Sequence, residues 1–342
     1  MIKILIPELE KHRNETTFRP YLLAKNMFED VGIRFVTSGD HDIVWIGQAS
    51  FLNKGLSLEQ SSEIGYNFCK QFDAPVILVD GQDSHSLIGT SEVVSKLIDS
   101  GKSPAMVLKN TLLEKDKYSN GYFTGRLYWG PGDYKPDPRA VNITQLSGTN
   151  WLSTVKMDFS QRHNILKVVD VSAMFSYGNM DGTEHGVRHS EAYSSFRSRC
   201  ITNLSLSKSL KVNMVSPGQR YPEDRYFNMM AEGKVIVAPF GYGEIAPRDI
   251  HAAMMNSILV KPSMNHLKSE PWVYEDGITY FACKHDYSDV VDVVEYVLSD
   301  YKNLRDMSVE SMIKYFNERY SHERVVMYIY NLLSNLDFVS HE

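Results

Sequence analysis

The stretch that most constrains the fold covers residues 234–262, KVIVAPFGYGEIAPRDIHAAMMNSILVKP. Its β-branched run at residues 235–238 predicts a buried strand, and a second apolar run at residues 258–260 predicts another. Pro247 suits the first position of a helix, so we expect a helix between the two strands. A strand, a glycine-bearing loop, a helix and a strand in this order indicate one unit of an α/β fold with a parallel sheet.

The loop between the first strand and the helix has the residues of a phosphate-binding site. The first N–H groups of a helix have no intrahelical partner and carry partial positive charge, and Gly241 and Gly243 allow a ligand to approach the backbone closely. Glu244, Arg248 and His251 add a carboxylate, a guanidinium and an imidazole near the same edge. Arg248 could pair with a phosphate, and Glu244 could accept sugar hydroxyls. A Gly-x-Gly before a helix is also common in ordinary turns, so both interpretations stay open.

Strand and helix signals alternate along the rest of the chain. Residues 2–6, 75–80 and 105–109 read as buried parallel strands, and a fresh strand is expected at residues 165–171. At 342 residues the chain exceeds the usual size of one domain. We therefore predict two doubly wound α/β domains.

Three further segments complete the prediction. Residues 118–151 are rich in Gly, Pro and Tyr without a clear period, which indicates an extended loop. After an amphipathic helix that starts near residue 290, two more helices are expected, capped near Ser308 and Ser321.

The fingerprints G-x-G-x-x-G after the first strand and G-x-x-x-x-G-K-[ST] are absent from the sequence, which counts against a common dinucleotide dehydrogenase and a P-loop enzyme.

Charge and cysteine content narrow the class of protein. The formal net charge of −6 and a pI near 6.0 give no global reason to bind nucleic acid or an anionic membrane, although a local basic groove stays compatible with them. The three cysteines are far apart, which fits neither a disulfide framework nor a metal site and favours a reducing compartment. No secretory leader or long apolar run is visible, so we expect a cytoplasmic protein without a transmembrane segment.

Polar residues follow the predicted strands of the first half. Glu8 follows the first strand, and Asp83 lies in the Asp-Gly-Gln-Asp run after residues 75–80. Ligands of doubly wound sheets bind beyond the carboxyl ends of the strands, which makes both carboxylates candidates for a catalytic base, Asp83 first. The same run is also typical of a turn or a helix cap.

Two pairs of residues in the second half of the sequence are candidates for binding a diphosphate or a metal ion. Arg197 and Arg199 lie on a predicted helix and could meet a diphosphate, although solvated helix charges need no function. His185 and His189 have the spacing of metal ligands on one helix face but no third ligand at a defined spacing. We therefore expect no metal site.

Residues 165–300 resemble the donor-binding half of GT-B glycosyltransferases, mainly through PFGYGEIAPRDIHAAMMNSILVKP and then GITYFACKHDYSD. In the group-1 and exostosin-like families this position carries a glycine-rich loop with an acidic residue, matched here by Gly241, Gly243 and Glu244. Arg248 matches the helix start, and residues 258–262 match the closing strand. The family's second glutamate is replaced by His251, one residue closer to Glu244 than in the family.

The resemblance implies two Rossmann-like domains facing each other across a cleft. Residues 1–163 would form the acceptor domain and residues 164–305 the domain for a nucleotide-sugar. Residues 306–342 would be C-terminal helices, which could pack back on the N-terminal domain. In this fold the helix N-terminus stabilises the leaving diphosphate, and no metal or other cofactor is expected.

The implied activity is a hexosyl- or pentosyltransferase reaction from a nucleoside-diphosphate sugar to a hydroxyl of a glycan or other small acceptor. A variant of this hypothesis uses modified bases of phage DNA as acceptors, which the acidic total does not favour. A non-catalytic nucleotide-sugar binding protein is a second class, motivated by the altered glutamate spacing. A phosphosugar epimerase of the same two-domain architecture is a third.

Overall fold

The structure is a computed structural model that describes residues 1–7, 17–52, 56–82, 85–114, 117–118, 135–154, 159–160, 166–176, 191–216, 219, 221–241 and 243–336. Contacts divide the chain into two compact units. Unit 1 comprises Met1–Thr154, Leu267–Pro271 and Tyr320–Glu342, and unit 2 comprises Val155–His266 and Trp272–Arg319. The domain bounds expected from the sequence, at residues 163 and 305, stay predictions.

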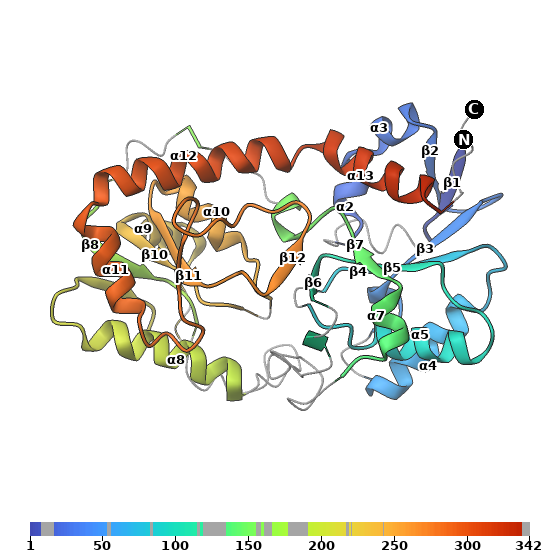
Figure 1. Ribbon diagram of the computed structural model, residues 1–342, viewed down its shortest axis with the longest axis horizontal. Coiled ribbons are helices and arrows are strands. Elements are labelled where there is room, and N and C mark those ends of the chain that lie inside the picture. Colours follow the sequence, from blue (N-terminus) through green and yellow to red (C-terminus); the bar gives the residue numbers. More distant parts are fainter. Residues whose placement is uncertain are drawn as a thin grey trace. The chain divides into compact units, whose positions relative to one another are not determined.

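Unit 1 is built on a parallel sheet of six strands in the order β2-β1-β3-β4-β5-β7 (Figure 1). The strands are β1 (Ile2–Leu5), β2 (Ile33–Val36), β3 (Ile43–Gly47), β4 (Val76–Asp80), β5 (Met106–Lys109) and β7 (Thr144–Leu146). The helices are α2 (Arg19–Leu23), α3 (Lys25–Asp30), α4 (Leu58–Cys69), α5 (Thr90–Asp99), α7 (Pro138–Asn142) and α13 (His322–Ser334), with 3-10 turns η1 (Gln48–Ser50) and η3 (Trp151–Thr154). A separate antiparallel pair joins β6 (Thr111–Leu113) to β12 (Leu267–Ser269).

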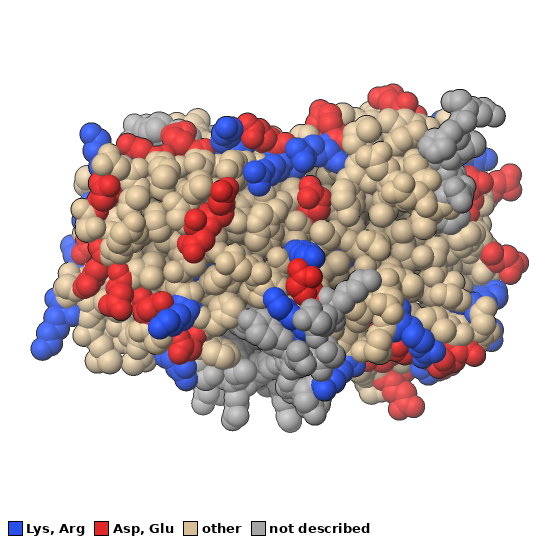
Figure 2. All heavy atoms as spheres, viewed as in Figure 1, with Lys and Arg blue, Asp and Glu red and all other residues tan. Residues whose placement is uncertain are grey.

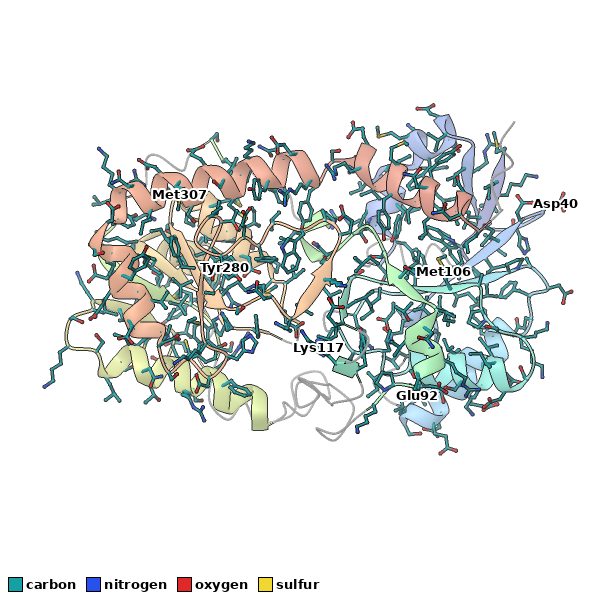
Figure 3. The ribbon with its side chains drawn as sticks, viewed as in Figure 1. Asp40, Glu92, Met106, Lys117, Tyr280 and Met307 are labelled. Carbon is teal, nitrogen blue, oxygen red and sulfur yellow. The ribbon has the colours of Figure 1, made fainter. Side chains whose placement is uncertain are left out.

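The core of unit 1 explains why the last helix belongs to it. Alternate residues of the strands, such as Ile4, Trp45 and Met106, face one apolar cluster with α2 and α3, and Figure 3 labels Met106 in its strand. The apolar face of α13, which includes Ile329, packs into the same cluster. Tyr320–Glu342 is therefore part of unit 1 although it is the end of the chain.

Unit 2 is a parallel sheet of five strands in the order β13-β11-β10-β8-β9. The strands are β8 (Val169–Ala173), β9 (Val212–Met214), β10 (Gly233–Val237), β11 (Ile258–Pro262) and β13 (Phe281–Cys283). The helices are α8 (Glu191–Leu206), α9 (Glu223–Ala231), α10 (Pro247–Met254), α11 (Val290–Ser299) and α12 (Tyr301–Arg319). Residues of α8 and α11 share an apolar cluster with one face of the sheet, and Tyr301 and Leu304 at the start of α12 pack against it (Figure 1). Helix α9 contacts β8 and β10, whereas α10 and α12 contact β11 and each other.

Side chains inside unit 2 connect its loops to its strands. Tyr280, labelled in Figure 3, is buried, and its hydroxyl accepts a hydrogen bond from the N–H of Met264 at 3.0 Å.

Cys69 of unit 1 and Cys200 and Cys283 of unit 2 are buried and form no disulfide. The cysteines therefore serve as small core residues.

Three expectations about elements were wrong. The region read as an extended loop contains α7 and β7, because Asp137 caps a short helix at Pro138 and a three-residue strand then joins the sheet edge. The helix expected from a cap near Ser308 starts at Tyr301 instead. Ser308 lies buried inside α12, where its hydroxyl donates to the Thr279 carbonyl at 3.2 Å and does not cap the helix. The strand expected from residue 165 starts at Val169.

Candidate functional site

The loop after β10 lies where the strand order of unit 2 reverses. From β8 the chain goes to β9 on one side of β8 and then to β10 on the other side. The carboxyl ends of β8 and β10 therefore flank a topological switch point, the place where doubly wound sheets bind ligands. Residues 174–176 follow β8 there, and residues 238–246 lead from β10 to the N-terminus of α10.

The two glycines of the loop contact each other through their backbones. The N–H of Gly241 donates to the carbonyl of Gly243 at 2.9 Å. A Cβ atom built on Gly241 would lie 3.5 Å from Nη2 of Arg197, an ordinary contact. Folding alone would therefore tolerate an alanine at Gly241, so packing in the free protein does not require glycine at this position.

Arg197 ties the two loops of the switch point together. Its side chain is buried, and its Nε donates to the Phe240 carbonyl at 2.9 Å while Nη1 donates to the Ser176 carbonyl at 3.0 Å. The guanidinium carbon lies 5.7 Å from the centre of the Phe175 ring. Arg197 thus connects the residues after β8 to the residues after β10.

Arg248 approaches the same aromatic ring from α10. Its guanidinium carbon lies 5.9 Å from the centre of the Phe175 ring, and its Nε donates a long hydrogen bond of 3.4 Å to the Tyr226 hydroxyl. Nη1 is buried and has no hydrogen-bond partner among the described residues. A buried charged donor without an acceptor is costly, and a phosphate oxygen would satisfy it.

Four buried polar groups support the loop and the start of α10. Lys261 of β11 donates to Asp249 Oδ2 at 2.6 Å and to the Glu244 carbonyl at 2.8 Å. Asp249 Oδ2 also accepts from the Tyr274 hydroxyl at 2.5 Å. The Glu244 side chain is itself 1% exposed, and its predicted contact with sugar hydroxyls stays a prediction.

His251 lies one turn into α10 and packs its ring edge-on against Phe227, with 5.0 Å between the ring centres. Burial, together with the charge of Arg248, lowers the pKa of His251 to about 4. His251 is therefore neutral at pH 7 and could act on a ligand only through hydrogen bonds or contact, not through charge.

The remaining predicted residues lie elsewhere or outside the described parts. Arg199 is exposed two residues after Arg197, which places it on another face of α8. The pKa of the Asp286 carboxyl is lowered by hydrogen bonds from Ser288 and, to a smaller extent, by the charge of Arg199. Its diphosphate contact stays a prediction. Glu8, Asp83, His185 and His189 lie outside the described residues.

Sequence reasoning missed Lys261, Asp249 and Tyr226. Lys261 carried a signal, because a lysine within an otherwise apolar strand is rarely fully buried unless it is paired. Asp249 carried a weaker one as an acidic residue in the first turn of a helix. Tyr226 carried none.

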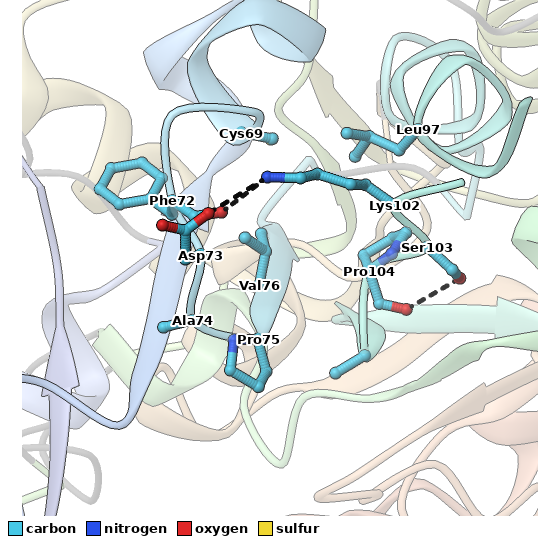
Figure 4. A pocket seen from close by; sticks show the side chains of 11 residues that line it. Cys69, Phe72, Asp73, Ala74, Pro75, Val76, Leu97, Lys102, Ser103 and Pro104 are labelled. Atoms are coloured by element: carbon cyan, nitrogen blue, oxygen red, sulfur yellow. Dashed lines mark hydrogen bonds and ion pairs between the residues drawn. The ribbon is translucent and has the colours of Figure 1, made fainter. Parts of the chain in front are cut away.

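Three observations concern other kinds of site. A cavity of about 350 Å³, lined mainly by Phe72, Leu97 and neighbouring residues, opens at the amino ends of β4 and β5, and Figure 4 shows Lys102 extending across it toward Asp73. This cavity lies at the opposite edge of the unit 1 sheet from its carboxyl ends, where ligands of such sheets bind. Within the described parts of the chain, no three His, Cys, Asp or Glu residues are grouped to hold a metal. No described helix is both long and apolar enough to cross a membrane.

No protein-family model and no curated protein matches the sequence. Among solved structures, the chain is similar to a sucrose-phosphate synthase from Thermosynechococcus elongatus, with 10% identity, a TM-score of 0.52 and coverage of 99% of this chain and 100% of that chain. Lower TM-scores are found for Anabaena HepE in complex with UDP-glucose (0.47; 10% identity; 98% and 100% coverage) and for UDP-GlcNAc 2-epimerase from Neisseria meningitidis bound to UDP-GlcNAc (0.43; 9% identity; 98% and 99% coverage). At these identities the similarity is one of fold. The chain therefore has the α/β fold predicted from its sequence, with two Rossmann-like units of the GT-B type.

Proposed function

We propose that this protein is a glycosyltransferase that moves a sugar from a nucleoside-diphosphate sugar to an acceptor hydroxyl. The observation that carries the proposal is Arg248, whose buried Nη1 has no hydrogen-bond partner among the described residues and lies at the switch point beside a glycine loop. The similarity of fold to a sucrose-phosphate synthase supports the same class of chemistry.

The proposed reaction breaks the bond between the anomeric carbon and the diphosphate oxygen and forms a bond from that carbon to the acceptor oxygen. Negative charge gathers on the leaving diphosphate as its bond breaks. Arg248 and the positive end of the α10 helix dipole would stabilise this charge. These groups could act on the diphosphate without a bound cation, and metal independence stays our prediction.

The acceptor hydroxyl loses its proton during the transfer. An inverting enzyme needs a base for this proton, and Asp83, with Glu8 as second choice, stays our prediction. A retaining enzyme needs no such residue. The acceptor itself, a glycan or another small hydroxyl compound, is the least constrained part of the proposal.

A nucleic-acid acceptor is less favoured. On the face shown in Figure 2, basic side chains are interspersed with acidic ones over the described residues. A phosphate-backbone partner would bind a surface with basic residues gathered on it, and its affinity would fall steeply with salt.

The experiment that tests the proposal is turnover of UDP-, GDP-, ADP- and dTDP-sugars, followed by release of the free nucleotide and by NMR of the sugar product. Acceptor-dependent release with a new glycosidic bond would support transfer. Formation of an epimer without acceptor would instead support an epimerase. Binding without turnover of any sugar nucleotide, across a broad acceptor panel, would support the non-catalytic alternative.

A further inference from the structure

Lys261 is a buried cation directly beneath the glycine loop. It is fully buried in β11, and its neighbour Val260 belongs to the apolar cluster on the opposite face of the sheet. Lys261 Nζ contacts Asp249 Oδ2 at 2.6 Å and the Glu244 carbonyl at 2.8 Å. It also lies 4.5 Å from the centre of the Tyr274 ring.

Asp249 is the third residue of α10, and its carboxylate caps the helix. Its Oδ2 accepts a hydrogen bond from the N–H of Ala246 at 3.1 Å, in addition to those from Lys261 and Tyr274. The side chain is 1% exposed. A buried carboxylate in the first turn stabilises the helix but adds negative charge at the place where the diphosphate would bind.

The opposing charge of Asp249 has to be cancelled if this helix end is to hold an anion. In a poorly solvated environment a unit charge a few ångströms away changes anion affinity roughly tenfold or more, at an effective dielectric constant of about 20. Among the described residues, Lys261 is the cation that forms an ion pair with Asp249. It therefore lies where it can cancel that charge without touching the ligand.

We propose that Lys261 is a positioning residue of the donor site, which neutralises the capping carboxylate of Asp249 and holds the Glu244 carbonyl so that the glycine loop and the α10 N-terminus can receive a diphosphate. This inference rests on the proposed function. It assigns a role to a side chain that is buried below the loop.

The test compares Lys261→Met, Asp249→Asn and the double variant Lys261→Met/Asp249→Asn by calorimetric titration. The probes are the nucleoside diphosphate that binds the unaltered protein best and the corresponding nucleoside without phosphates. Lys261→Met should weaken diphosphate binding roughly tenfold or more while leaving nucleoside binding within about twofold. Adding Asp249→Asn should recover most of that loss, because the double variant is again neutral at this position.

A matched control exists in unit 1. Lys109 Nζ and Asp80 Oδ1 form a fully buried ion pair at 2.7 Å, so Lys109→Met removes the same chemistry from another sheet. This variant should lower the melting temperature as Lys261→Met does, but it should leave the diphosphate dissociation constant unchanged. Thermal unfolding of every variant thus separates loss of stability from loss of binding.

The outcomes distinguish the inference from the proposed function. No diphosphate binding by the unaltered protein would overturn both. Binding that Lys261→Met leaves unchanged would overturn the inference alone. Weakened binding that Asp249→Asn does not recover would also overturn it, because the effect would then come from the damaged loop and not from charge.

Discussion

Replacing Arg248 by methionine should weaken nucleotide binding without lowering stability. The change removes a charged donor whose Nη1 is buried without a hydrogen-bond partner among the described residues. An unsatisfied buried polar group costs about 1–3 kcal/mol, whereas the long bond to Tyr226 and the contact with the Phe175 ring together contribute about 1 kcal/mol. The free energy of unfolding should therefore stay the same or rise by up to about 2 kcal/mol.

The same variant should lose affinity for a nucleoside diphosphate. A charge-assisted hydrogen bond contributes about 1.5–3 kcal/mol, which corresponds to a roughly 10- to 150-fold increase in the dissociation constant. Titration calorimetry measures the affinity, and urea unfolding measures the stability. Methionine is chosen because it keeps the length of the side chain and packs well in irregular apolar spaces.

Arg197→Met is the matched control, because both arginines lie near Phe175. Arg197 donates to two backbone carbonyls, of Phe240 and Ser176, so its loss leaves two acceptors unsatisfied and should lower stability by about 2–5 kcal/mol. If Arg248→Met is destabilised as strongly as Arg197→Met and binds the nucleotide normally, the reasoning about Arg248 is refuted.

Three further predictions concern pH and two glycines. Because the pKa of His251 is lowered from 6.5 to about 4, its stabilising effect is complete above pH 6.5 and is lost as the pH falls toward 4. Between pH 7 and pH 5 the free energy of unfolding should therefore fall by about 2 kcal/mol more in the unaltered protein than in His251→Leu. Urea titrations at the two pH values measure both decreases, and equal decreases would contradict the lowered pKa of His251. Gly241→Ala should change the unfolding free energy by less than about 0.5 kcal/mol, since its Cβ would lie 3.5 Å from Arg197 Nη2. The same variant should weaken diphosphate binding. An unchanged affinity in calorimetry would contradict a close approach of the diphosphate to the Gly241 backbone. Gly65→Ala should lower stability by about 1–3 kcal/mol, because its Cβ would lie 2.6 Å from Val93 Cγ2, and a neutral effect in urea unfolding would show that α4 and α5 can separate easily.

The unit from β10 to β11 could be read from the sequence because each of its signals is local. β-branched runs mark the two strands, and Pro247 is indeed the first residue of α10. The start of α12 could not be read in the same way. Ser308 resembles a helix cap, but its burial against Thr279 is set by tertiary packing that no local pattern shows.

The difference between the two arginines of the site also lies beyond the sequence. Arg197 is held by backbone carbonyls, which every residue carries, so no motif could indicate that its donors are used for structure. The pairing of Lys261 with Asp249 depends on which face of β11 lies beside α10. A charged residue in an apolar strand could have indicated that some partner exists, but not which one.

The most direct test of the central claim is a thermal-shift panel of UDP, GDP, ADP, CMP and dTDP with the unaltered protein, with and without magnesium. A ligand at 100 times its dissociation constant stabilises the protein by about 2.7 kcal/mol, enough for a shift of several degrees. We predict a shift with one nucleoside diphosphate that is the same without magnesium and is lost in Arg248→Met. No shift with any nucleotide would contradict the account and leave only the similarity of fold.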